Sequence, residues 1–63
     1  MFVKTKRVNE LRIGDTFFDK GIEYCVDRIQ RQGIYFSVWA HNVMGGQETL
    51  FLPWSGEKFV VEL

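Results

Sequence analysis

A stretch of alternating side chains at residues 33–42 constrains the fold of this chain more than any other part of its sequence. Every second residue is apolar, which separates Ile34, Phe36, Val38 and Ala40 from Tyr35, Ser37, Trp39 and His41. A period of two places neighbouring side chains on opposite faces of a β-strand. We therefore predict that this stretch is the central strand of a small sheet and that its apolar set faces the core.

The second set of side chains gives the main indication of function. A strand that buries one face ordinarily presents charged or small polar residues on the other. Here the other face carries two large aromatic residues, Tyr35 and Trp39. The sequence thus predicts a sheet with an unusual outer surface.

Turn signals divide the rest of the chain into short strands. Gly14-Asp15 and Asp19-Lys20-Gly21 are turn sequences, and they border a strand that contains Phe17 and Phe18. Further along, the apolar alternation slips by one residue near Asp27 and Arg28, which predicts a β-bulge there. A bulge would let a short sheet curl strongly.

A hairpin is expected at Gly45-Gly46, because two glycines accept the positive φ angles of a two-residue turn. Counting back from this turn gives three cross-strand pairs: Trp39 with Leu52, His41 with Leu50, and Ser37 with Trp54. Pro53 has no N–H to donate to a neighbouring strand, so the strand after the turn ends there or lies at an edge. Leu52 and Trp54 are exposed if the sheet curls little, and a strongly bent strand would fold them back into the core.

These elements predict an all-β fold. Five short strands with no segment of helical periodicity fit a small antiparallel barrel. Its predicted core residues are Leu11, Ile13, Phe17, Ile22, Tyr24, Val26, Ile29, Phe36, Val38, Ala40, Phe51 and Val60.

The length of the chain, 63 residues, suits a single small domain over residues 1–63 that buries about 60% of its unfolded surface. A content of 46% hydrophobic and 16% aromatic residues is too apolar for a disordered chain. The formal net charge is zero, but the start of the chain is basic, with Lys4, Lys6, Arg7 and Arg12. Residues 1–7 fit either a short strand or a loose basic arm, and the charge suits an anionic partner or a solvated end.

The expected location is the cytoplasm. Cys25 is the only cysteine, so no internal disulfide can form and a reducing compartment is expected. The sequence has no signal-peptide pattern, and no stretch approaches the roughly 18 apolar residues of a membrane span. We expect no association with a membrane.

Three segments resemble small SH3-like β-barrel proteins encoded by bacteriophages: Val8-x-x-Leu11-x-Ile13-Gly14-Asp15-x-Phe17, Gly21-x-Glu23-Tyr24-x-Val26, and Gly45-Gly46-x-Glu48-Thr49-x-Phe51. The resemblance covers residues 8–63. It implies a five-stranded antiparallel SH3-like barrel. It also implies a small regulator or inhibitor of a host or phage complex, acting in the host cytoplasm.

Residues with catalytic chemistry lack the partners that catalysis needs. His41 is the only histidine, and one carboxylate, Glu23, is expected beside it, which leaves a metal or general-base site incomplete. Cys25 has no cationic neighbour in the predicted sheet that would favour a reactive thiolate. We predict no catalytic residue, no metal site and no cofactor.

The outer face of the sheet is the predicted binding surface. Monomeric proteins seldom expose a contiguous apolar patch, and Trp, Tyr and Arg are enriched at interface hot spots. The favoured function is a non-enzymatic protein-binding module that forms a homodimer or docks on a larger host or phage protein. Its predicted contact residues are Arg28, Tyr35, Trp39, His41, Leu50, Leu52 and Trp54.

Single-stranded nucleic-acid binding is the alternative. Bases would stack on aromatic side chains while phosphates meet basic ones. Leu50 and Leu52 stand where such a surface would have Lys or Arg between the rings, which disfavours it. Its predicted residues are Lys4, Lys6, Arg7, Arg28, Arg31, Tyr35, Trp39 and Trp54.

Overall fold

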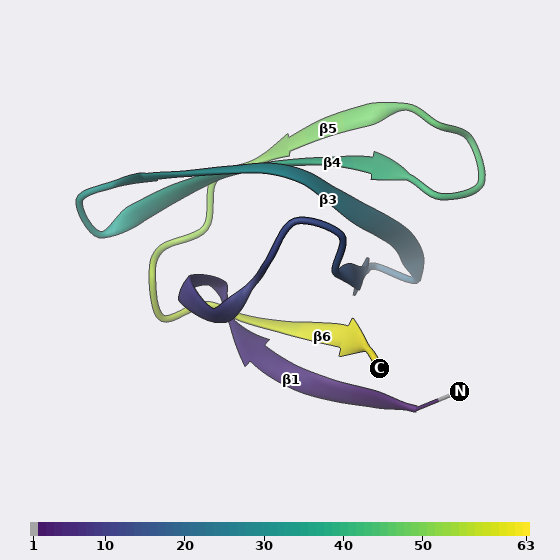
Figure 1. Ribbon diagram of the computed structural model, residues 1–63, viewed down its shortest axis with the longest axis horizontal. Helices are drawn as coiled ribbons and strands as arrows, with labels where there is room; N and C mark the ends of the chain where they lie inside the picture. The colour runs from purple at the N-terminus through teal and green to yellow at the C-terminus, as the bar shows by residue number, and fades with distance from the viewer. Residues whose placement is uncertain (1) are drawn as a thin grey trace.

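Residues 2–63 are described by the structure, a computed structural model. They form one 3₁₀ turn, η1 (Val8–Glu10), and six strands: β1 (Val3–Arg7), β2 (Thr16–Asp19), β3 (Ile22–Gln32), β4 (Tyr35–Asn42), β5 (Glu48–Phe51) and β6 (Lys58–Glu62). Neighbouring strands all pair antiparallel in one sheet of order β1-β6-β2-β3-β4-β5 (Figure 1). The prediction of an all-β fold is confirmed.

The sheet has six strands where the sequence predicted five, because the basic segment at the start of the chain forms a strand. β1 pairs with β6 from Val3↔Glu62 to Arg7↔Lys58, so residues 3–7 are not a loose arm; Met1 lies outside the described residues. β1 and β5 each have one neighbouring strand, so backbone pairing leaves the sheet unclosed. Within residues 2–63, no helix is long and apolar enough to cross a membrane.

Tight turns at both ends of β3 make β2, β3 and β4 consecutive neighbours. The β2–β3 loop consists of Lys20 and Gly21, whose φ angles are 52° and 79°. Positive φ at both central residues is what a type I′ hairpin turn requires. At the other end of β3, Gly33 has a φ of 65° and forms the next two-residue loop with Ile34.

The predicted bulge is present in β3. The β3–β4 register shifts between Val26 and Arg28, so Asp27 has no opposite residue. An extra residue bends its strand and increases the local twist. β3 is 11 residues long, and the part after the bulge pairs only with β4. The bulge therefore divides β3 into two directions, and the sheet curls there (Figure 1).

The β4–β5 connection differs from the predicted two-residue turn. Trp39 lies opposite Leu50, not Leu52, so the predicted register is wrong by two residues. The cause is a longer loop at residues 43–47, in which the Asn42 side-chain oxygen accepts hydrogen bonds from two following N–H groups at 2.9 and 3.2 Å. A shift of two residues leaves every side chain on its original face. The predicted faces are correct although the pairs are not.

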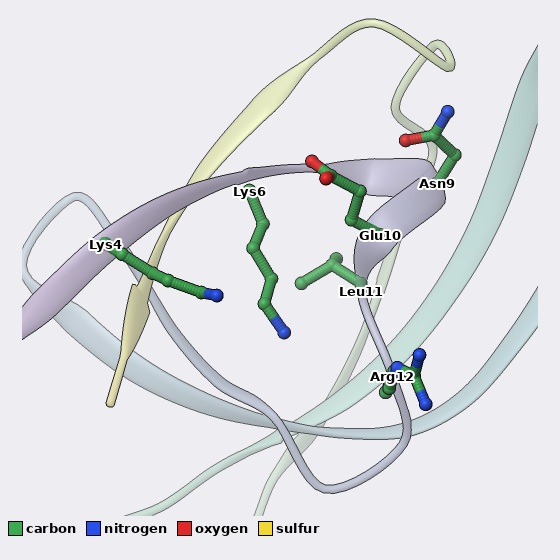
Figure 2. Close-up of a pocket in the computed structure, with 6 residues that line it drawn as sticks. All are labelled: Lys4, Lys6, Asn9, Glu10, Leu11 and Arg12. Carbon is green, nitrogen blue, oxygen red and sulfur yellow. The ribbon is translucent and has the colours of Figure 1, made fainter.

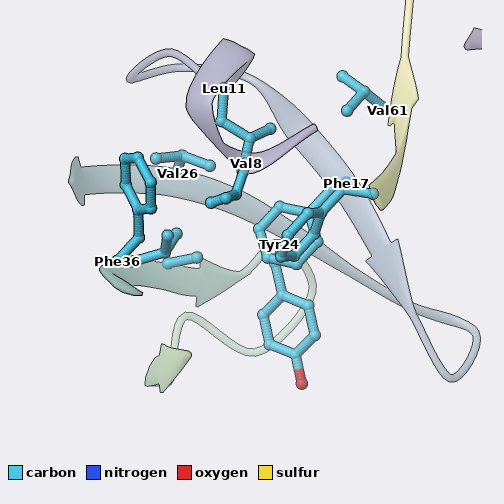
Figure 3. Close-up of a cluster of buried hydrophobic side chains, with 10 residues drawn as sticks. Val8, Leu11, Phe17, Tyr24, Val26, Phe36 and Val61 are labelled. Atoms are coloured by element: carbon cyan, nitrogen blue, oxygen red, sulfur yellow. The ribbon is translucent and has the colours of Figure 1, made fainter. Parts of the chain in front are cut away.

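The core is centred on Phe17, which β2 places fully inside the curled sheet. Its ring centroid lies 5.6 Å from that of Tyr24, 5.2 Å from Phe51 and 4.9 Å from Phe59. Figure 3 shows Phe17 beside Tyr24 among the buried side chains. Stacked and edge-to-face ring pairs add to the free energy gained from burial. The cluster joins side chains from β2, β3, β5 and β6.

Most of the predicted core is confirmed. The confirmed buried residues are Leu11, Phe17, Tyr24, Val26, Phe36, Val38 and Ala40, and Ile29 and Phe51 are partly buried against them. The sequence prediction missed Val8, Phe59 and Val61, which are also buried.

Four residues predicted to face the core are exposed by 42–69%: Ile13, Ile22, Ile34 and Val60. The three isoleucines lie in or beside turns, where the chain reverses outside the core. In β6 three consecutive residues are apolar, so no polar residue marks which of them point inward. The pairing of β6 with β2 determines which residues point inward, because Val61 lies opposite Phe17 and shares its buried face.

Two adjacent phenylalanines test the core assignment. Phe17→Ala is expected to lower the free energy of unfolding by about 3–5 kcal/mol, because it removes a fully buried ring and leaves a cavity. That loss is comparable with the whole stability of a domain this small. Phe18→Ala is the matched control, since Phe18 lies on the opposite face and is only half-buried. We expect urea unfolding to show that Phe18→Ala loses less than half as much free energy of unfolding as Phe17→Ala. Equal losses in the two variants would contradict the placement of Phe17 at the centre of the core.

A pair of carboxyl groups makes part of the stability depend on pH. A hydrogen bond with Glu62, together with desolvation and the like charge of Glu62, raises the pKa of Glu23 above its ordinary value. A carboxyl whose pKa is raised by folding stabilises the protein below the unfolded-state pKa. That contribution is lost as the pH rises through the folded-state pKa.

Glu23→Gln is therefore expected to raise the melting temperature at pH 7, where it removes the repulsion between two carboxylates. Near pH 4 the wild-type pair already holds a proton, and the substitution should have little effect. Glu57→Gln, at an exposed carboxylate, controls for the change in net charge. A thermal-melting series across this pH range in which both variants behave alike would exclude the proposed coupling.

Candidate functional site

Large side chains lie on the outward side of the sheet around β4, and we call them the aromatic face: Arg28 on β3, Tyr35 and Trp39 on β4, Leu50 on β5, and Leu52 and Trp54 just after β5. Trp39 lies at its centre, with Arg28 opposite on β3 and Leu50 opposite on β5. Tyr35 forms an isolated bridge with Trp54, whereas the sequence predicted Ser37 as the partner of Trp54. The apolar members other than Trp39 are 49–67% exposed, so neither Leu52 nor Trp54 folds into the core.

Arg28 covers part of the central tryptophan. Its guanidinium carbon lies 4.6 Å from the centroid of the Trp39 ring, within the range of a cation–π contact. Arg28 is the first residue after the bulge, and the shifted register places it opposite Trp39. The bulge thus brings a charged side chain onto an otherwise apolar surface.

The position of Trp54 is set by the chain on both sides of it. Phe36 donates a backbone hydrogen bond to Pro53 at 2.8 Å, and Ser55 donates one to Ile34 at 2.6 Å. The Trp54 indole lies directly over Gly56, where a Cβ atom would collide with the ring. Glycine at this position therefore lets the indole lie flat against the turn while its other side remains exposed.

His41 lies beside the aromatic face but is engaged within the fold. Its Nδ1 lies 2.9 Å from both carboxylate oxygens of Asp27, the extra residue of the bulge. The carboxylate next to His41 is thus Asp27, whereas Glu23, which the sequence placed there, is close to Glu62. Cys25 lies opposite His41 on β3, and its Sγ is directed to the Gly14 carbonyl at 3.9 Å. The contact between Asp27 and His41 ties the bulge to β4.

Metal ligands do not gather at this place or elsewhere in the described part of the chain. Within residues 2–63, no group of three or more His, Cys, Asp or Glu side chains could hold a metal ion.

Most of the basic residues predicted for nucleic-acid binding lie on strands that are not next to the aromatic rings in the sheet. Lys4, Lys6 and Arg7 lie on β1, which β6, β2 and β3 separate from β4 in the sheet.

Arg31 lies on the other side of the sheet from the aromatic face. Its guanidinium carbon is 5.6 Å from the ring centroid of Phe36, a buried residue, and its Nε donates to the Gly33 carbonyl at 3.1 Å. Of the basic residues named in the sequence prediction, the structure brings only Arg28 to the aromatic face.

A second candidate site, which the sequence did not predict as a unit, lies between β1 and the segment that follows η1. This basic groove is a cavity of about 610 Å³ lined by Lys4, Lys6, Asn9, Glu10, Leu11 and Arg12 (Figure 2). Lys4 and Lys6 enter it because they lie opposite Val61 and Phe59 and share their inward face. Their spacing of two residues is the one local signal in the sequence that they share a face.

The carboxylates near the groove are already engaged. Asp15 accepts hydrogen bonds from Lys6 Nζ at 2.9 Å and from the Arg12 N–H at 3.0 Å. Partial burial acts to raise the pKa of Asp15, but these hydrogen bonds and the charges of Lys6 and Arg12 outweigh it and lower the pKa below its ordinary value. Glu10 accepts the backbone N–H of Arg7 at 2.9 Å. Within residues 2–63, the side chains of Lys4 and Arg12 have no ion-pair partner.

Comparison of the sequence with models of known protein families and with curated proteins finds no match in either. The function is therefore inferred from the two surfaces described above.

Proposed function

We propose that this protein is a non-enzymatic protein-binding module and that the aromatic face is its contact surface. The observation that carries the proposal is the exposed ridge of large apolar side chains around Trp39. Apolar patches of this kind on small proteins ordinarily mark interaction sites. The proposed partner is a second copy of the chain or a larger protein.

The composition and layout of the face match those of an interface hot spot. Hot spots are enriched in Trp, Tyr and Arg, cluster at the centre of the contact and are surrounded by residues that exclude water. Trp39 and Arg28 form the centre, while Leu50 and Leu52 supply apolar surface beside them. Because Trp39 is half-buried in the sheet, its ring is already held in place before a partner binds.

The same contacts argue against base stacking on this face. A base would have to displace the Arg28 guanidinium from the ring of Trp39. Arg31 and the basic residues of β1 are not within the face to meet phosphates. A protein partner would not have to displace Arg28 and would not need further basic residues, since it can bury the Arg28–Trp39 pair in its present arrangement.

We further propose that the curled sheet is an SH3-like barrel and that the protein acts as a small accessory factor or inhibitor. The bulge at Asp27 and the aromatic cluster around Phe17 support a barrel-like curl. The resemblance of residues 8–63 to phage-encoded proteins of this shape supports the accessory role.

Trp39→Ala is expected to weaken self-association or partner binding at least about thirtyfold, because a central desolvated tryptophan contributes about 2 kcal/mol or more. Sedimentation velocity over a concentration series measures self-association. If the wild type is monomeric, a photo-crosslinking residue at position 52 identifies the partner in a lysate, and titration with that purified partner gives the affinity.

Ile13→Ala is the matched control for Trp39→Ala, since Ile13 is a large exposed residue outside the aromatic face. It should leave association unchanged, and thermal melting should show that both variants fold. A folded Trp39→Ala variant that associates as well as the wild type would refute the proposal.

A further inference from the structure

The basic groove gathers positive charge from two separate parts of the fold. Lys4 and Lys6 lie on β1, and Arg12 lies in the segment after η1. In Figure 2 the side-chain nitrogens of these residues follow one another from the Lys4 end of the groove to Arg12, with the Leu11 side chain between Lys6 and Arg12. Three basic side chains thus border one open concavity with an apolar residue in its wall.

The charges in the groove are available to a ligand. Glu10 accepts the Arg7 backbone N–H but keeps its negative charge, and Asp15 pairs with Lys6 and also feels the charge of Arg12. An ammonium group has three donors, so Lys6 can keep its hydrogen bond with Asp15 and still donate to a ligand. Lys4 and Arg12 have no ion-pair partner among residues 2–63. The groove therefore presents three cationic groups beside the carboxylates of Glu10 and Asp15, and its cations outnumber its anions by one. Lys6 is pre-positioned by Asp15.

We propose that the basic groove binds the phosphodiester backbone of a single-stranded nucleic acid. Alternate residues of a strand are about 6.6 Å apart, from a rise of about 3.3 Å per residue, so Lys4 and Lys6 present charges at a regular step along β1. A ligand with regularly repeated negative charges matches such a row better than one isolated anion does. Arg12 adds a third cationic group to the lining of the groove.

This site differs from the stacking surface considered from the sequence, and it does not depend on the proposed function of the aromatic face. The groove has no aromatic side chain in its lining, so base stacking contributes nothing there. Binding through phosphates alone releases counterions and is insensitive to base sequence. We therefore expect weak, sequence-independent binding that falls steeply as the salt concentration rises.

Fluorescence anisotropy with a labelled oligothymidylate of about 12 nucleotides, within the usual range of small single-strand binders, measures the affinity at several salt concentrations. The test variant is Lys4→Ala with Arg12→Ala, which leaves the Lys6–Asp15 pair intact. The matched control is Lys20→Ala with Lys58→Ala, which removes the same charge from exposed positions outside the groove. Thermal melting confirms that each variant is folded.

The groove variant is expected to bind at least about tenfold more weakly at low salt. Its plot of log affinity against log salt should be shallower by about 1.4, since each lost phosphate contact on a single strand removes about 0.7 from the slope. The control should stay within about threefold of the wild type with an unchanged slope. Trp39→Ala should bind the oligonucleotide like the wild type, which separates this inference from the function of the aromatic face.

Four outcomes would overturn the inference. The first is no binding by the wild type at low salt, and the second is an equal loss in the groove variant and the control, which would indicate diffuse attraction. The third is full competition by inorganic phosphate at the concentration of oligonucleotide phosphate, which would make the groove a site for isolated anions. The fourth is equally tight binding of polyglutamate, which would make it a general site for acidic chains.

Discussion

The packing of Phe17 against rings from three other strands determines the shape of this protein. Phe51 on β5 and Phe59 on β6 both contact Phe17 on β2, although β3 and β4 lie between β2 and β5 in the sheet. The sheet must curl until β5 reaches the core side of β2. Side chains thus bring together strands that backbone hydrogen bonds do not join. The bulge at Asp27 makes that curl possible by bending the strand in between.

A curl this tight leaves a small interior, and the outer surface has to carry the remaining large side chains. From Tyr35 to His41 buried residues alternate with more exposed ones along β4, and Val38 and Ala40 fill the interior on either side of Trp39.

The two edges of the sheet differ in charge. β1 carries Lys4, Lys6 and Arg7, and a charged edge of this kind discourages pairing with another strand. The β5 edge has Glu48 as its one charged residue, and it adjoins the aromatic face.

Local patterns were enough to predict the parts of the fold that depend on neighbouring residues. The alternation of β4, the slip near Asp27 and the turn at Asp19-Lys20-Gly21 can each be recognised from a few neighbouring residues. The structure has all three, with Lys20 and Gly21 as the loop of the turn. The β4–β5 register was wrong because the Asn42 side chain, not a glycine pair, organises the loop. Such a side-chain contact leaves no periodic trace in the sequence.

Features that depend on strands distant in the chain could not be predicted in the same way. The inward phase of β6 and the direction of Lys4 and Lys6 both follow from pairing between the two ends of the chain. The composition of β1 showed only that it is basic. The outward position of Tyr35 and Trp39 could be predicted because it needs only the alternation of β4. The basic groove needs the β1–β6 pair and the path of the chain after η1.

The position of the groove follows from a sheet that curls without closing. Lys4 and Lys6 occupy the face of β1 that would be core if β1 lay further inside the sheet, opposite Val61 and Phe59. A charged side chain on a core-facing position is costly unless it is paired or reaches water. Lys6 meets this condition through Asp15, and Lys4 meets it by being exposed at the sheet edge. The margin of the unclosed sheet is therefore the place where the fold tolerates inward-facing cations, and an anionic ligand can reach them there from solvent.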